Sequence, residues 1–264
     1  MRIATWNVNS VKQRIENLCA WLRERQPDIV CLQETKCQDE AFPREPLEAL
    51  GYNVAIHGQK TFNGVAILSK LAFDEVTPRL PGDAEDDHAR FLEAVVSTPT
   101  GALRVASIYL PNGNPVPAKY DYKLSWMQRL LNYSSERLKL EEPLVLAGDY
   151  NAIPAEADVH NPELWRSDAL FLPQTRSRWR ALTNLGLTDA IRATTADPGL
   201  YTFWDYQAGA WQKNNGIRID HLLLSPQAAD RLVTAGIDKH VRAWERPSDH
   251  VPVWIELDLE KPGD

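Results

Sequence analysis

Short apolar runs along the chain repeatedly end in a small polar side chain. Brief apolar or alternating runs bounded by Gly, Pro or polar residues are typical of β-strands. By this criterion we predict strands over residues 2–6, 28–32, 52–57, 64–68, 91–96, 103–109 and 144–147. Ser10 is a good N-cap for a helix through Gln26, before Pro27, and a longer amphipathic helix is predicted over residues 120–140. This order of strands and helices predicts a layered α/β fold.

The second half of the chain is less regular. Residues 152–178 form a polar segment that is too long for a simple connection, which favours a functional loop. A helix is predicted over residues 179–185, an aromatic strand over 201–206, a strand over 216–225 and a β-rich run over 247–256. Because no linker or change in composition separates the two halves, we expect one domain over residues 1–264, with two similar sheets.

The composition narrows the possible classes of protein. Hydrophobic residues make up 44% and charged residues 25%, which is ordinary for a globular protein. The net charge of −7 argues mildly against a non-specific nucleic-acid binder, although a local basic groove can lie on an acidic protein. The cysteines, Cys19, Cys31 and Cys37, include no closely spaced pair, so we expect a reducing, cytoplasmic compartment. No apolar run approaches the about 18 residues of a membrane span.

The polar residues at the predicted strand ends are the candidate site. Carboxylate and carboxamide oxygens suit Mg2+ or Mn2+, and an Asp paired with a His fixes the orientation of the imidazole. The chain has no catalytic serine motif and no glycine-rich phosphate loop. These residue types favour metal-dependent phosphodiester hydrolysis. The candidates are Asn7, Glu34, Tyr109, Asn112, Asp149, Asn151, Asp220, Asp249 and His250.

Each candidate also has a purely structural alternative. Asn7 could cap the first helix, Glu34 could be an ordinary acid at a helix start, and Tyr109 could belong to the core. Asp220 lies inside an apolar run, so its charge must be paired or functional. Arg218, two residues earlier, lies on the same face of the predicted strand and offers a simple ion pair.

Seven short motifs follow one another along the chain. They are Trp6–Ser10, Gln33–Lys36, Tyr109–Asn112, Gly148–Asn151, Tyr201–Trp204, Arg218–Asp220 and Ser248–His250. In this order and at these spacings they resemble the exonuclease III family of AP endonucleases, which belongs to the endonuclease/exonuclease/phosphatase superfamily. The resemblance covers nearly the whole chain, and seven motifs in order are very specific.

The resemblance implies a fold and a metal site. The fold is a four-layered α/β sandwich in which two mixed β-sheets pack face to face, with helices outside. Glu34 would be the principal ligand of Mg2+ or Mn2+, helped by Asn7 and Asp249. Asp149 would activate or orient the attacking water, with Asn151 beside it.

The resemblance also implies how the substrate is held. His250, held by Asp220, would contact the scissile phosphate, together with Tyr109 and Asn112. Lys36 and Arg90, and with less specificity Lys119, are candidates for contacts with DNA phosphates. An apolar pocket for a base-less sugar falls on Phe203, Trp204, Ile217 and Ile219.

The implied activity is Mg2+-dependent cleavage of duplex DNA 5′ to abasic sites by a monomer, with 3′-5′ exonuclease activity and trimming of damaged 3′ ends. Two features depart from relatives: Ile217 replaces a large aromatic residue, and the segment after Asn112 lacks a nearby arginine. His160 lies in the polar segment, where relatives vary. Two alternatives remain, namely a phosphatase of lipid or inositol phosphates and a non-catalytic DNA-binding scaffold.

Overall fold

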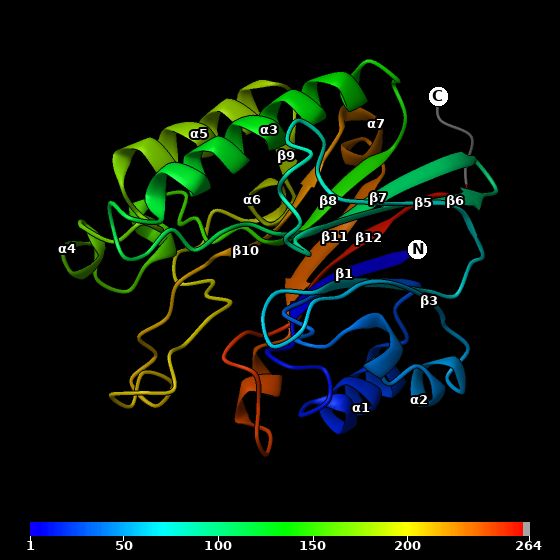
Figure 1. Cartoon of the computed structure of the whole chain (residues 1–264), viewed down its shortest axis with the longest axis horizontal. Coiled ribbons are helices and arrows are strands. Elements are labelled where there is room, and N and C mark those ends of the chain that lie inside the picture. The colour runs from blue at the N-terminus through cyan, green and yellow to red at the C-terminus, as the bar shows by residue number, and fades with distance from the viewer. Residues whose placement is uncertain (261–264) are drawn as a thin grey trace.

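The computed structural model describes residues 1–260, in which two six-stranded sheets pack face to face (Figure 1). The first sheet has the order β11-β12-β1-β2-β4-β3 and the second β5-β6-β7-β8-β10-β9. The strands of the first sheet are β1 (Arg2–Asn7), β2 (Ile29–Gln33), β3 (Asn53–His57), β4 (Val65–Ser69), β11 (Leu232–Ile237) and β12 (Val253–Leu257). Those of the second are β5 (Phe73–Pro78), β6 (Phe91–Thr98), β7 (Gly101–Tyr109), β8 (Leu144–Asp149), β9 (Thr188–Asp189) and β10 (Asp220–Leu224).

Helices connect the strands and cover the outer faces of both sheets. The α-helices are α1 (Ile15–Arg25), α2 (Glu45–Glu48), α3 (Tyr120–Leu138), α4 (Pro162–Trp165), α5 (Pro173–Asn184), α6 (Ala190–Thr194) and α7 (Pro226–Ala229). Short 3₁₀ helices cover Asp39–Ala41, Glu156–Asp158 and Lys239–Ala243. Within residues 1–260, no helix combines the length and apolar character needed to cross a membrane.

Both sheets are mixed, and each contains one parallel pair. β1 pairs with β2 and β7 with β8 in parallel, whereas the other neighbouring strands are antiparallel. Each parallel pair is connected through a long helix, α1 or α3, because a parallel neighbour can be reached only by crossing over a face of the sheet. The predicted similarity of the two sheets is therefore confirmed.

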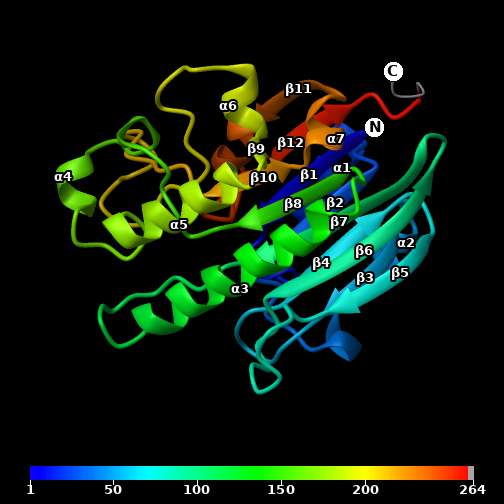
Figure 2. The same ribbon diagram turned by 90° about the horizontal axis from the view of Figure 1, so that it is seen from above.

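Alternating burial along the strands builds four layers. In β1, Ile3 faces the opposite sheet, whereas Ala4 and Trp6 face α1. α1 and α2 cover the first sheet, while α3 and α5 lie over the second (Figure 2). Trp126 of α3 and Trp179 of α5 pack into the core beneath these helices. The predicted four-layered α/β sandwich, with helices outside two mixed sheets, is confirmed.

The first predicted helix and the predicted aromatic strand differ from the structure. The first helix begins at Ile15 and not at Ser10. Ser10 has a left-handed φ of 82°, and its N–H donates to the Glu34 carbonyl at 2.7 Å, so the residues before α1 form a loop held beside Glu34. The segment over residues 201–206 forms only single bridges at Phe203, since its rings pack in an aromatic cluster around Trp204.

Candidate active site

The register of the strands brings the predicted polar residues to one edge of both sheets. Asn7 lies opposite Gln33 at the ends of the parallel strands β1 and β2. In the second sheet, Asp149 lies beside Tyr109 in β7 and opposite Asp220 in β10. Because the ends of parallel strands meet at the same edge, residues far apart in the chain converge there.

Asn7 connects the two sheets at this edge. Its side-chain N–H group donates to Glu34 Oε1 and to Asp149 Oδ2, both at 2.9 Å, and the residue is fully buried. Asn7 Oδ1 accepts the N–H of Asn9 at 3.0 Å, so Asn7 closes a turn and does not cap α1. Glu34 begins no helix: its φ is 49°, and Lys36 Nζ lies 3.0 Å from its Oε2. Burial acts to raise the pKa of Glu34, but Lys36 and Asn7 outweigh it, so this pKa is lowered.

His250 and Asp220 form a buried pair. Nδ1 of His250 lies 2.8 and 3.0 Å from the two carboxylate oxygens of Asp220, and Nε2 lies 3.7 Å from Asp149 Oδ2. Burial acts to lower the pKa of His250, but the charges of Asp220 and Asp149 raise it to about 10. The alternative ion pair with Arg218 does not form, because its guanidinium binds Asp158 at 2.7 Å. The imidazole is therefore held protonated and fixed in orientation.

Asp149 is the carboxylate whose protonation is most finely balanced. Its pKa is raised to about 7 by burial and by the charge of Asp220, against the opposing effects of His250, the Asn151 N–H and Asn7. The Asn151 N–H donates to Asp149 Oδ1 at 2.9 Å, while Asn7 binds the other oxygen. A carboxylate with a pKa near neutrality and a fixed orientation suits a general base.

The two predicted carboxamides form a pair beside Asp149. Asn112 Nδ2 donates to Asn151 Oδ1 at 3.2 Å, and Asn151 Nδ2 donates to the carbonyl of Leu110 at 2.8 Å. Asn151 has a left-handed φ of 43°, which turns the chain sharply after β8. The pair places amide groups where a phosphate oxygen could be bound.

Tyr109 supplies a protonated hydroxyl at the same edge. Burial and the neighbouring charges of Glu34 and Asp149 raise the pKa of Tyr109 well above its ordinary value. The Arg90 guanidinium stacks on the tyrosine ring at 4.9 Å, and Arg90 also donates to the Tyr109 carbonyl at 3.3 Å. Tyr109 therefore remains a hydrogen-bond donor at neutral pH.

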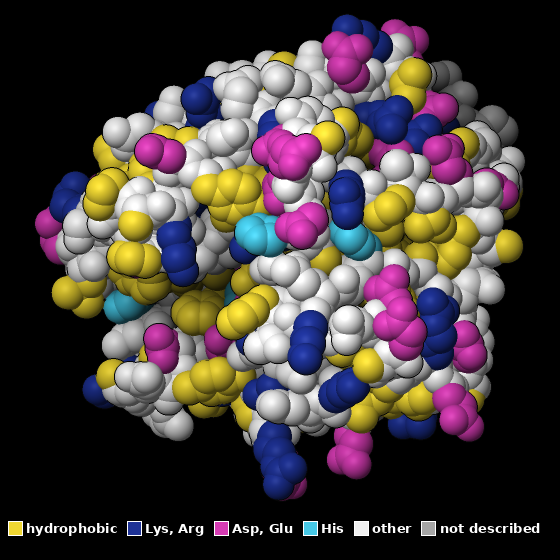
Figure 3. Space-filling model, viewed as in Figure 1, with side chains coloured by type: hydrophobic (Ala, Val, Ile, Leu, Met, Phe, Trp, Pro, Cys, Tyr) yellow, Lys and Arg dark blue, Asp and Glu magenta, His cyan; other side chains and the backbone are white. Residues whose placement is uncertain are grey.

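A cavity of about 320 Å³ collects most of the candidates. Trp165, the last residue of α4, is one of its walls. In the view of Figure 3, the surface is hollowed between the α4 side of the molecule and the loops below it. The predicted residues among its walls are Glu34, Tyr109, Asn112, Asp149, Asn151, Phe203, Ile219, Asp249 and His250. Asn7 and Asp220 are fully buried and act on this cavity through the residues that they hold.

Besides Asn7 and Asp220, four predicted residues lie outside the walls of this cavity. Lys36 instead bonds Glu34 and Asn9, and Arg90 lies on Tyr109. Ile217 lines an adjoining cavity of about 440 Å³, which also contains His160. Trp204 lines neither cavity: its indole is fully buried and donates to Asn214 Oδ1 at 3.2 Å.

Several wall residues were not predicted. Trp165 and Asp168 come from the polar segment, whose length alone indicated a role, and Asp205 follows the aromatic motif. Asn9 joins Lys36 Nζ at 2.7 Å and Asp249 Oδ1 at 3.1 Å, so it links the first loop to the last. Asn9 stands within the first of the seven motifs, and its short polar side chain was the only local indication.

The donor set fits a hard divalent cation. Oxygens of Glu34 and Asp149 and a ring nitrogen of His250 lie within 4.8 Å of one another. His250 is unsuited as a ligand because its imidazole is held protonated, whereas carboxylate oxygens are the ligands that Mg2+ and Mn2+ prefer. The buried negative charge that raises the pKa of Asp149 is what a cation would offset.

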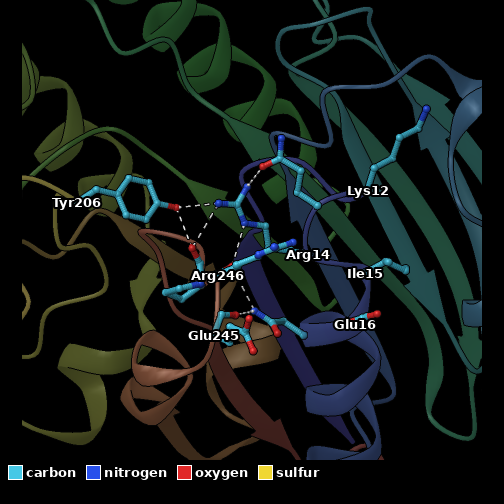
Figure 4. A pocket seen from close by; sticks show the side chains of 10 residues that line it. Lys12, Arg14, Ile15, Glu16, Tyr206, Glu245 and Arg246 are labelled. Carbon is cyan, nitrogen blue, oxygen red and sulfur yellow. Dashed lines mark hydrogen bonds between the residues drawn. The ribbon is translucent and has the colours of Figure 1, made fainter.

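A larger cavity of about 810 Å³ lies between α1, its preceding loop and the loop over residues 245–247 (Figure 4). Arg14 donates there to the carbonyls of Arg246 at 3.3 Å and Pro247 at 3.4 Å and to the Tyr206 hydroxyl at 3.2 Å. These contacts occupy its guanidinium and tie the first loop to the last. The walls of this cavity include Glu16 and Glu245 but no His or Asp, so they offer no counterpart of the buried His250–Asp220 pair.

The chain resembles known nucleases over almost its whole length. Residues 4–250 match the model of the Endonuclease/Exonuclease/phosphatase family. Exodeoxyribonuclease III of Haemophilus influenzae is 35% identical, and the match covers 97% of this chain and 100% of that protein. The DNA repair nuclease APEX1 of Danio rerio is 32% identical, and the match covers 97% of this chain and 82% of that protein. Among solved structures, the 3′ phosphatase NExo from Neisseria, bound to a product DNA hairpin, superposes with a TM-score of 0.93 at 37% identity, covering 98% of this chain and 99% of its own. An AP endonuclease from Archaeoglobus fulgidus superposes with a TM-score of 0.92 at 34% identity over the same shares. The chain therefore belongs to the endonuclease/exonuclease/phosphatase family, among the exodeoxyribonuclease III-like DNA-repair nucleases.

Proposed function

We propose that this nuclease cleaves the backbone of duplex DNA 5′ to abasic sites and trims damaged 3′ ends in the same cavity, in a reaction that depends on Mg2+ or Mn2+. The observation that carries the proposal is the position of Asp149, which Asn7 and Asn151 orient 3.7 Å from the His250 imidazole. Both side chains line the same cavity, so a base and a cationic donor would face a phosphate bound there.

Glu34 and Asp249 would hold the cation from the walls of the cavity, with Asn7 keeping Glu34 in place. A bound divalent cation offsets the charge that develops on the phosphate oxygens during hydrolysis. Lys36 lies 3.0 Å from Glu34 Oε2 and partly balances the same carboxylate. Lys36 would thus be in position to move toward a DNA phosphate when the cation binds.

The proton and the phosphate would be handled by separate groups. Asp149 accepts the proton of the attacking water, since its pKa of about 7 allows it to be ionised at neutral pH. His250, held protonated by Asp220, donates to a non-bridging oxygen, and Tyr109 and Asn112 supply further donors. In-line attack then breaks the bond between phosphorus and the 3′ oxygen, and the released 3′ oxygen takes a proton from water. The products are a 3′-hydroxyl and a 5′-deoxyribose phosphate.

The walls beside the phosphate suit a sugar without a base. Phe203 and Ile219 line the cavity next to His250, whose ring lies 5.0 Å from that of Phe203. Ile217 widens the neighbouring space because it is smaller than an aromatic residue. An extruded abasic nucleotide fits such an apolar wall, and a normal nucleotide would have to place its base elsewhere.

The remaining properties are proposed on simpler grounds. We propose one domain over residues 1–264, since both sheets share one core. Exposed large hydrophobic side chains such as Phe62, Leu164 and Val233 lie on separate elements, which supports a monomer. The free cysteines are all buried, which fits a reducing, cytoplasmic compartment.

The test is incubation with a duplex that contains one tetrahydrofuran abasic site, with Mg2+ and with EDTA. We expect a single cut 5′ to the site, a 3′-hydroxyl product and no cleavage in EDTA. A parallel assay with a 3′-phosphate terminus measures end trimming. Turnover of inositol phosphates with no cut in abasic DNA would favour the phosphatase alternative. Binding of DNA without cleavage, together with a thermal stability unchanged by Mg2+, would favour the scaffold alternative.

A further inference from the structure

One buried lysine has no part in the chemistry proposed above. Lys123 lies in α3, is fully buried and is not among the residues that line the cavity of about 320 Å³. Its Nζ donates to the carbonyl of Asn112 at 3.0 Å and to the carbonyl of Asn151 at 2.5 Å. An ammonium group buried inside a protein carries a large cost of desolvation, which the hydrogen bonds to these two carbonyls must offset.

The two carbonyls belong to the two amide-bearing turns of the site. Asn112 follows β7 and Asn151 follows β8, and these strands are parallel neighbours. On the cavity side, Asn112 Nδ2 donates to Asn151 Oδ1 at 3.2 Å. The side chains of Asn112 and Asn151 therefore meet on the cavity side of the two turns, and Lys123 joins the backbone carbonyls of the same two residues.

The Asn151 turn is sharp. Its φ of 43° lies in the left-handed region, which Asn adopts more readily than most residues other than Gly. The same turn directs the Asn151 N–H at Asp149 Oδ1, 2.9 Å away. A shift of this turn would therefore move both an amide and the base.

The surroundings of Lys123 are shaped to admit its side chain. Gly113 has a φ of 86°, and a Cβ at this position would lie only 2.6 Å from Lys123 Cδ. Burial lowers the pKa of Lys123 to about 7, while the charges of Asp168 and Asp149 oppose that change. Both the charged and the neutral amine have at least two N–H donors, so either form can hold both carbonyls.

We propose that Lys123 is a positioning residue that sets the geometry of Asn112 and Asn151, and through Asn151 the orientation of Asp149. It acts from behind the site and touches neither phosphate nor cation. This inference rests on the proposed function, because its effect is read in the rate of phosphodiester cleavage.

The first test compares Lys123→Met with wild type on the abasic duplex at saturating Mg2+. Methionine has a similar length and no donors, so both carbonyls lose their partner. We expect kcat to fall about 10–100-fold with KM changed less than about threefold, since small misplacements of catalytic groups are costly. The matched control is Arg137→Met at the other end of α3, where Arg137 binds Glu93 at 3.0 Å. That variant should lose stability and keep its kcat.

A double-mutant cycle separates positioning from a general loss of structure. If Lys123 acts through Asn151, the loss caused by Lys123→Met should largely disappear in an Asn151→Ala background. If the methionine variant does not fold, Lys123→Gln replaces it. The glutamine amide nitrogen lies one bond closer to the backbone than the lysine Nζ, so it holds the two carbonyls less closely.

The outcomes separate the two proposals. Cleavage by wild type together with an unchanged kcat in the folded Lys123 variant, or additive losses in the cycle, would overturn the positioning role. Absence of cleavage by wild type itself would instead overturn the proposed function.

Discussion

Asp220→Asn tests how the buried pair controls the reaction. Asp220 is fully buried and its two oxygens lie 2.8 and 3.0 Å from His250 Nδ1. The substitution preserves the size of the side chain but removes the charge that holds the imidazole protonated. It also allows an amide N–H to face Nδ1, which disfavours the N–H form at that nitrogen.

The magnitude follows from the pKa of His250. The difference between about 10 in the folded protein and the ordinary 6.5 corresponds to about 5 kcal/mol. Without Asp220, only the charges of Asp149 and Asp249 still oppose burial, so the pKa falls toward the ordinary 6.5. At that ordinary value about a tenth of the imidazole carries a proton at about pH 7.5, so kcat should fall up to about tenfold from the lost proton alone. The wrong tautomer could extend the loss to about 10⁴, as for the Asp of a Ser–His–Asp triad.

The assay is cleavage of the abasic duplex at saturating Mg2+ across a range of pH. The loss in Asp220→Asn should grow as pH rises from about 6 to 9, because the variant loses its proton in this range and wild type retains it. Asp238→Asn is the matched control, since Asp238 is also buried and accepts from Trp21 Nε1 at 2.7 Å, outside the cavity. The control should lose stability and keep the pH profile of wild type. A kcat for Asp220→Asn near that of wild type, or a loss equal at every pH, would refute the role given to the pair.

Three further predictions address the carboxylate, the buried ion pairs and the cation. Without a bound cation, the pKa of Asp149 is about 7 in the folded protein and 3.8 ordinarily. The folded protein therefore binds this proton more tightly than the unfolded chain, and its stability falls as pH rises from 3.8 to about 7. Asp149→Asn should therefore be more stable than wild type above about pH 7, by at most about 4 kcal/mol. Urea denaturation measures this difference in stability, and a difference that does not grow with pH would contradict the prediction. Arg218→Met should lower the free energy of unfolding by about 3–5 kcal/mol because it leaves buried aspartates such as Asp158 less compensated; an unchanged urea midpoint would contradict this. Asn7→Ala should raise the Mg2+ concentration needed for half-maximal cleavage about 10–100-fold, because Glu34 loses its support, and an unchanged Mg2+ titration would dismiss that role.

The sequence predicted most of the central strands and most of the cavity because both depend on local patterns. Strands such as β1 and β8 are apolar and end in polar residues, so their periodicity and their ends could be recognised. The edge strands β5 and β11 were missed, since many of their residues are partly exposed and their apolar pattern is weak. The length of β10 was overestimated because Gly216–Ile219 continues its apolar run without pairing as a strand.

Contacts between distant residues could not be predicted from local patterns alone. The partner of Asp220 is His250, thirty positions along the chain, and only the family resemblance implied this pair. Lys123 lies on an amphipathic helix, where a lysine usually faces solvent, and only the packing of α3 over the ends of β7 and β8 shows its contacts. Trp204 lies outside the walls of the cavity, and a motif alone does not show on which side of the chain each ring lies.

The most direct test of the central claim is the single-turnover rate of cleavage of the abasic duplex by His250→Ala and Glu34→Ala at saturating Mg2+. Each side chain lines the same cavity as Asp149, one as the phosphate donor and the other as the cation ligand. Both variants should fold and bind the duplex, and each should cleave it at least about 10²-fold more slowly than wild type. Rates near that of wild type in either variant would contradict the assignment of this cavity as the active site.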